Sequence, residues 1–170
     1  MPDVLGVAEI HRVLQGLLRE RISVPELGTV MGVPGDVGRQ VKDPDVLAER
    51  VRTALYRTIT LANLSDDKRL HAVALTLAAE DTITESLRDE RGAPQSAMEP
   101  GHIESLSRQV EQETKKIASY GHEAIVVCSP AIRLALRRLL ERQLPHVPVL
   151  AYTEIAPNAN MAVEGMVGLV

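Results

Sequence analysis

The stretch between residues 123 and 155 constrains the fold more than any other part of the chain. It begins with EAIVVCS, a continuous apolar run that indicates a central strand covered on both faces. Ser129 then caps an amphipathic helix, which begins at Pro130 and ends before Pro145. The run VPVLAYTEI follows as a second strand. A strand, a helix and a strand in so short a space predict a right-handed parallel crossover.

The first 64 residues predict a helical lobe. From Ala8 to Arg21, apolar residues recur at the three- and four-residue spacing of an amphipathic helix. A short helix is expected at Pro25 to Met31, followed by a loop rich in Gly and Pro through Gly38. A second long helix begins at Pro44, behind a capping Asp43. Its expected buried stripe consists of Leu47, Val51, Ala54, Leu55 and Ile59.

The charged run from Ser65 to Arg69 marks the start of a second lobe, so two domains are expected at 1–64 and 65–170. Within LHAVALTLAAE the apolar period is two, which indicates a strand. The residues expected on one face of this strand are Val73, Leu75 and Leu77. Helices are then expected at about Thr82–Arg91 and at Glu99–Ser119, and MAVEGMVGLV is expected to form the last strand.

Together these patterns predict an α/β fold, α+β overall. An N-terminal helical lobe precedes a C-terminal α/β lobe with a small mixed sheet. The chain contains no Phe and no Trp, so its core must consist of aliphatic side chains. No apolar run approaches the roughly 20 residues needed to cross a bilayer, and the fragment itself is expected to be soluble.

Charge and aromatic content argue against nucleic acid as a partner. The formal net charge is -4 and the isoelectric point is near 5.7, whereas nucleic-acid binders usually carry a clustered basic surface. Only three tyrosines could serve as stacking platforms for single-stranded bases. We therefore expect a module that binds other proteins.

The sequence CSP at positions 128 to 130 offers the most tempting catalytic signal, because nucleophiles are often displayed where a strand turns into a helix. The glycines of a nucleophile elbow are missing, and Pro130 has no backbone N–H for an oxyanion. Helix capping accounts for Ser129. A hydrolase that uses Ser129 or Cys128 is kept as an alternative, but no catalytic residue is predicted.

Metal and cofactor motifs are also missing from the sequence. Cys128 is the single cysteine, which excludes a multi-thiolate zinc site and an internal disulfide. The five histidines lack HxxxH and HExxH spacing, so a metal site would require residues that converge only in the tertiary structure. No glycine pattern for phosphate binding is present. Neither a cofactor nor a metal is predicted.

The helix after Ser129 carries a basic face. Its members are Arg133, Arg137, Arg138 and Arg142. Residues three and four apart share one side of a helix, so at least three of these side chains are expected to project together. A solvated face is the simpler interpretation. The functional interpretation is a docking surface for an acidic protein partner, whose binding would depend steeply on salt.

Three blocks of sequence resemble one known family. They are RVLQGLLRERIS (Arg12 to Ser23), KDPDVLAERVRTAL (Lys42 to Leu55) and SPAIRLALRRLLERQLPHVPVLAYTEI (Ser129 to Ile155). In this order and spacing they are similar to the C-terminal cytoplasmic domain of the flagellar and type III secretion export-gate family, the FlhA, LcrD and InvA type. The segment VCSPAIR resembles the flagellar branch of the family more than the injectisome branch.

The resemblance implies a function that composition does not. Members of this family lie in the bacterial inner membrane, and their cytoplasmic halves form a ring, commonly nine-membered, at its cytoplasmic face. The ring receives export chaperones with their substrates and soluble components of the export apparatus. The resemblance further implies that residues 1–64 and 65–170 are the third and fourth cytoplasmic subdomains. It implies a non-enzymatic role, with the transmembrane region and the principal chaperone-docking groove upstream of this chain.

Overall fold

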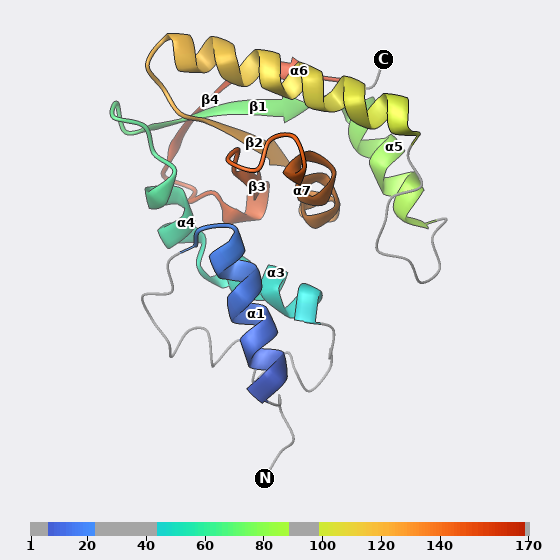
Figure 1. Ribbon diagram of the computed structural model, residues 1–170. Helices are drawn as coiled ribbons and strands as arrows, with labels where there is room; N and C mark the ends of the chain where they lie inside the picture. Colours follow the sequence, from blue (N-terminus) through green and yellow to red (C-terminus); the bar gives the residue numbers. More distant parts are fainter. Residues whose placement is uncertain (1–6, 23–43, 89–98, 169–170) are drawn as a thin grey trace. The chain divides into compact units, whose positions relative to one another are not determined.

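The computed structural model describes residues 7–22, 44–88 and 99–168 (Figure 1). The chain divides into two compact units, Met1–Ala62 and Asn63–Val170, so the division lies two residues before the predicted boundary. The helix expected at Pro25–Met31 and the loop after it lie outside the described residues, as does the capping Asp43. Within the described ranges, no helix is both long enough and apolar enough to span a membrane.

The first unit is helical, as predicted. Its described helices are α1 (Val7–Arg19), α3 (Pro44–Ala54) and α4 (Tyr56–Ala62), and α1 contacts α3. The predicted long second helix is interrupted at Leu55. The buried apolar residues are Val13, Leu17, Ile22, Leu47, Val51, Leu55 and Ile59. The predicted stripe is therefore confirmed except at Ala54, which is exposed.

The second unit is built on a four-stranded sheet of order β3-β2-β1-β4. The strands are β1 (Arg69–Leu75), β2 (Ala124–Cys128), β3 (Val149–Ala151) and β4 (Asn160–Val167). The predicted α/β class and the central position of β2 are confirmed. The expected mixed sheet is wrong, because all three pairings are parallel. After β3 the chain returns through residues 152–159 to the opposite edge and pairs with β1 in parallel.

Three helices complete the core of this unit. They are α5 (Leu77–Arg88), α6 (Pro100–Ser119) and α7 (Arg133–Glu141). Figure 1 shows α6 lying along β1 and β4, and α6 also contacts β2 and α7. The core cluster contains aliphatic residues and Cys128, with members from all four strands and all three helices. The aliphatic core expected from the sequence is therefore present in this unit.

Several element boundaries differ from the prediction: α5 begins at Leu77 and not at about Thr82, and β3 covers only Val149–Ala151 of the run VPVLAYTEI. At the end of β1 and at the start of α7, a side-chain hydroxyl explains the difference. Leu77 is 75% exposed instead of continuing β1, because Thr76 ends the strand and its Oγ1 accepts the N–H of Ala79 at 3.2 Å. Ser129 Oγ accepts the N–H of Ala131 at 3.3 Å, so it caps a turn, and α7 begins only at Arg133.

Candidate functional site

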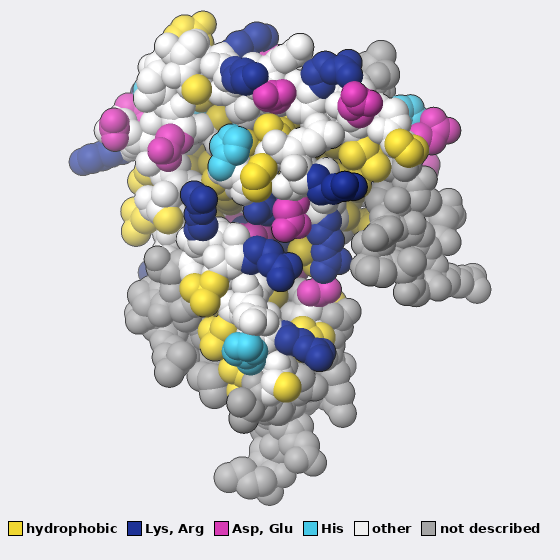
Figure 2. Space-filling model, viewed as in Figure 1, with side chains coloured by type: hydrophobic (Ala, Val, Ile, Leu, Met, Phe, Trp, Pro, Cys, Tyr) yellow, Lys and Arg dark blue, Asp and Glu magenta, His cyan; other side chains and the backbone are white. Residues whose placement is uncertain are grey.

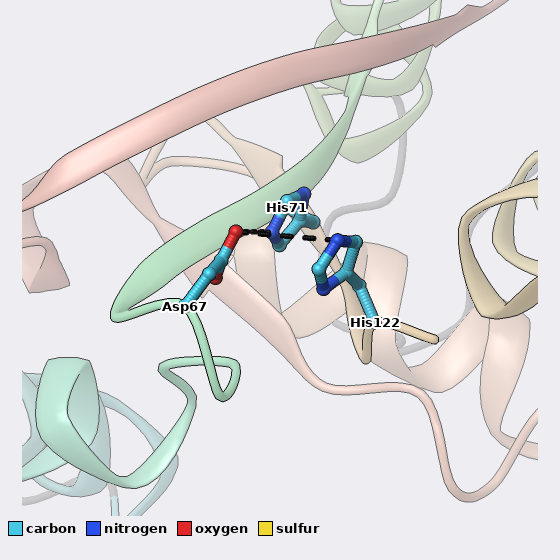
Figure 3. Close-up of side chains that lie close together, drawn as sticks. All are labelled: Asp67, His71 and His122. Carbon is cyan, nitrogen blue, oxygen red and sulfur yellow. Dashed lines mark hydrogen bonds and ion pairs between the residues drawn. The ribbon is translucent and has the colours of Figure 1, made fainter. Parts of the chain in front are cut away.

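Two histidines and two carboxylates lie close together near the N-terminal ends of the central strands of the sheet. Figure 3 shows three of these side chains, Asp67, His71 and His122, grouped beside β1. His71 is the third residue of β1, Asp67 lies in the turn before β1, and His122 comes two residues before β2. Glu164 completes the group from β4. Because β1 lies between β2 and β4, its His71 can meet groups from both neighbouring strands.

A tight turn positions Asp67. The N–H of Lys68 donates to the carbonyl of Ser65 at 2.8 Å, and Lys68 has a φ of 60°. Asp67 Oδ1 accepts the N–H of Arg69 at 3.1 Å. This bond holds one carboxylate oxygen against the backbone, which leaves Oδ2 facing the histidines.

Backbone irregularities place the other two members. α6 ends in a turn where Gly121 has a φ of 85°, a conformation that glycine adopts without strain, and His122 follows directly. In β4 the pairing with β1 moves from Val163 to Gly165 between consecutive β1 residues, so Glu164 is the extra residue of a β-bulge. As the extra residue of the bulge, Glu164 directs its carboxylate to His71.

His71 is clamped between two carboxylates. Its Nδ1 lies 2.9 Å from Glu164 Oε1 and its Nε2 lies 2.9 Å from Asp67 Oδ2. The His122 ring stacks on the His71 ring, with centroids 3.9 Å apart and planes 7° from parallel. His122 Nδ1 lies 3.2 Å from Ser65 Oγ, and His122 Nε2 lies 4.0 Å from Asp67 Oδ2.

The two carboxylates favour the charged form of His71. Burial of the ring lowers the pKa of His71, but the hydrogen bonds to Glu164 and Asp67 outweigh this effect, and the net shift is upward. For Asp67, burial raises the pKa, while the hydrogen bond with His71 and the backbone bond from Arg69 lower it, and the net shift is downward. The two carboxylates therefore stabilise the protonated form of His71 relative to a histidine in water.

The same cluster contains the described residues that could hold a metal ion. Asp67, His71 and His122 each offer one ligand atom, and the three atoms lie within 4.8 Å of one another. Sequence reasoning missed this site, because the two histidines are far apart in the chain. A histidine inside an otherwise apolar strand, with an aspartate four residues before it, was the one signal available.

Two of the four arginines predicted to form a docking surface are buried. Arg133 is 0% exposed and Arg137 is 7% exposed, so neither belongs to an exposed docking surface. Arg133 Nη1 donates to the carbonyl of Val149 at 3.0 Å, and its Nε lies 3.8 Å from the buried Glu154 carboxylate. These contacts attach α7 to β3 and to the segment that follows it.

Arg138 and Arg142 are exposed on α7, as the prediction requires. Figure 2 shows that basic and acidic side chains are interspersed over the visible face. The exposed pair stays a prediction for a protein contact.

Replacing Arg137 with methionine is expected to lower the free energy of unfolding by about 1.5 to 3 kcal/mol. Its Nη1 donates to the carbonyl of Val147 at 3.3 Å and its Nη2 to that of Pro145 at 3.1 Å, so the change leaves two carbonyls without a charged donor. Urea denaturation measures the loss. Arg142→Met on the same helix is the control and should change stability by less than about 0.5 kcal/mol. Equal losses would contradict the structural role of Arg137.

The proposed nucleophiles occupy structural positions. Cys128 is fully buried in the core cluster at the end of β2. The N–H of Ser129 donates to Glu80 Oε1 at 3.1 Å, and its hydroxyl caps the turn before α7. Neither arrangement favours the hydrolase alternative.

Comparison with known proteins gives one consistent result. The chain matches the family model described as the FHIPEP family over residues 1–160. The flagellar biosynthesis protein FlhA of Bacillus subtilis (strain 168) is 32% identical over 168 residues, which are 99% of this chain and 25% of that protein. The chain therefore spans about a quarter of the length of this relative.

Solved structures share the fold. The nonameric SctV-C of EPEC superposes with a TM-score of 0.84 at 24% identity, covering 96% of this chain and 49% of that chain. A chain of the Chlamydia pneumoniae CdsV and CdsO protein complex also gives a TM-score of 0.84, at 19% identity, covering 95% of this chain and 47% of that chain. At these identities the likeness shows the fold.

Proposed function

The chain belongs to the FHIPEP family, and on that premise we propose that it forms part of the cytoplasmic portion of an export gate of the flagellar or type III secretion kind. The observation that carries the proposal is the match of the family model to residues 1–160. The 32% identity to a flagellar biosynthesis protein supports the flagellar branch.

The two compact units correspond, in this proposal, to the third and fourth cytoplasmic subdomains of the family. The division between residues 62 and 63 supports the correspondence, because it separates a helical unit from an α/β unit. The membrane-spanning part belongs to the same full-length protein, which anchors these subdomains at the cytoplasmic face of the inner membrane. The role is one of binding and assembly, without catalysis.

Neighbouring copies and soluble export components are the proposed partners. The nonameric state of SctV-C from EPEC supports assembly into a ring. The complex of CdsV with CdsO supports contact with a second, soluble protein. Export chaperones with bound substrates are proposed as further partners, docked mainly through subdomains outside this chain.

Export from cells tests the proposal directly. The region that corresponds to residues 7–168 is deleted from the full-length gene, and secretion of flagellar subunits and swimming are measured. We expect both to be lost, with membrane insertion of the remaining protein unchanged on fractionation. Normal secretion and swimming after the deletion would refute the proposed role.

The exposed arginines of α7 are the proposed contact for an acidic partner. The double variant Arg138→Glu and Arg142→Glu is expected to weaken binding of soluble export components about tenfold at low salt, and less at high salt, because exposed charges are screened. Calorimetry at two salt concentrations measures this change. The control, Arg108→Glu with Lys115→Glu, alters charge equally on α6, where the two side chains are 62% and 73% exposed. Equal weakening by both double variants would remove the specific role of α7.

A further inference from the structure

We propose that Asp67, His71 and His122 form a binding site for a divalent transition-metal ion, for which Zn²⁺ is the best match. The inference goes beyond the export role and does not depend on it. It rests on three ligand atoms, two from residues 67–71 and one from His122, that lie within 4.8 Å of one another at the N-terminal end of the strands. Figure 3 shows the Asp67 carboxylate beside the two stacked rings.

The spacing of the ligand atoms suits a small tetrahedral ion. Ligands bound to zinc at about 2.0 to 2.1 Å stand about 3.3 Å apart in a tetrahedron. Asp67 Oδ2 lies 2.9 Å from Nε2 of His71 and 4.0 Å from Nε2 of His122. These two distances bracket the required value, and the third separation, between the ligand nitrogens of the two rings, is within 4.8 Å.

Both histidines already have the outer partners that metal-bound imidazoles require. Histidine ligands usually donate their second ring N–H to a carboxylate, a carbonyl or water, which fixes the tautomer. Glu164 faces Nδ1 of His71 at 2.9 Å, and the Ser65 hydroxyl faces Nδ1 of His122 at 3.2 Å. In both rings Nε2 is therefore the nitrogen directed to the ion.

Charge also favours a divalent cation. When both imidazoles are neutral, the carboxylates of Asp67 and Glu164 give the cluster two negative charges. A divalent cation balances them. On binding, the ion replaces the proton on Nε2 of His71, and that proton leaves to solvent. Two imidazoles and one carboxylate favour zinc and its transition-metal neighbours over Mg²⁺ and Ca²⁺, which prefer oxygen ligands.

Partial exposure permits the one rearrangement that binding needs. The rings of His71 and His122 are nearly parallel, so one must tilt before both Nε2 lone pairs point to the same ion. The His122 side chain is 26% exposed and that of Asp67 is 34% exposed, whereas His71 is held inside the sheet. His122 and Asp67 can therefore adjust around a fixed His71, and water completes the fourth position.

Calorimetry of the untagged, chelator-treated 170-residue chain tests the site. Titration with ZnCl₂ is expected to show one ion per chain, with no comparable signal from MgCl₂ or CaCl₂. His122→Ala and Asp67→Asn should each weaken Zn²⁺ binding at least tenfold. The control is His146→Ala, which removes an exposed histidine of the same unit and should bind Zn²⁺ as the unchanged chain does. Far-UV circular dichroism confirms that each variant is folded.

Cobalt provides a second readout. The visible absorption of Co²⁺ in the chain should have the intensity of a tetrahedral site and should disappear in Asp67→Asn, which lies in an exposed turn and is expected to fold normally. Three results would each overturn the proposal: no saturable Zn²⁺ binding, unchanged binding in both ligand variants, or equal loss in His146→Ala and His122→Ala.

Discussion

Replacing Arg133 with methionine is expected to lower the free energy of unfolding of the C-terminal unit by about 3 to 5 kcal/mol. Arg133 is 0% exposed, and its contacts include the carbonyl of Val149 and the carboxylate of Glu154, which is 1% exposed. Methionine fills much of the same volume but carries no charge. The change therefore removes this cation from a buried carboxylate, and the loss of one member of a buried ion pair dominates the effect.

Two further variants make the expected result for Arg133 specific. Arg138→Met removes an exposed arginine from the same helix and should change stability by less than about 0.5 kcal/mol. Adding Glu154→Gln to Arg133→Met should restore part of the lost stability, because the carboxylate charge is gone. Urea denaturation measures the free energies, and hydrogen exchange at β3 locates the effect. Equal stability of the two single methionine variants would contradict the buried ion pair.

Periodicity predicted most of the helices and strands, because it reports which side of an element is apolar. It could not predict the direction of the arginines on α7. Arg133 and Arg137 follow the same spacing as the apolar residues Ile132, Leu136 and Leu140. Charged residues are ordinarily assigned to solvent, and only the tertiary structure reveals the backbone carbonyls around Pro145 and Val149 that satisfy these guanidinium groups.

The candidate site was harder to predict than the fold. In the sequence, His71 and His122 are two of five histidines that lack metal-ligand spacing. Their contact depends on β1 and β2 being neighbours in register, with His71 opposite Ala124. The separate contact of His71 with Glu164 depends on the bulge in β4, which no sequence pattern marks. The side chains of the site come together because of the order of the strands in the sheet. Local periodicity in the sequence does not predict that order.

The end of β1 could have been predicted from the sequence. The run LTLAAE continues the apolar alternation of the strand, which favoured Leu77 as a buried strand residue. The same run also places a threonine before a good helix-forming segment, the usual pattern of a helix N-cap. Thr76 takes this role in the structure, and Leu77 is exposed. Here capping was the stronger signal.

Replacing Leu106 with alanine is expected to destabilise the same unit by about 2 to 5 kcal/mol. Leu106 is 0% exposed and belongs to α6, the helix that contacts β1, β2, β4 and α7. The loss combines the transfer free energy of the removed atoms with the cost of the cavity they leave. The cluster around Leu106 consists of aliphatic residues and Cys128, without aromatic rings. Refilling the cavity would therefore require small branched side chains to leave their rotamers.

Leu77→Ala is the matched control for Leu106→Ala, since it makes the same chemical change at a side chain that is 75% exposed. It should alter the free energy of unfolding by less than about 0.5 kcal/mol. Urea midpoints at an unchanged slope separate the two variants, and hydrogen exchange should show faster opening throughout residues 63–88 and 99–168 for Leu106→Ala only. If exchange accelerated equally in both units, the division of the chain into two separately packed cores would be contradicted. The Leu106 variant tests the core of the second unit alone. Its effect depends on burial within that packed cluster, and not on hydrophobicity alone.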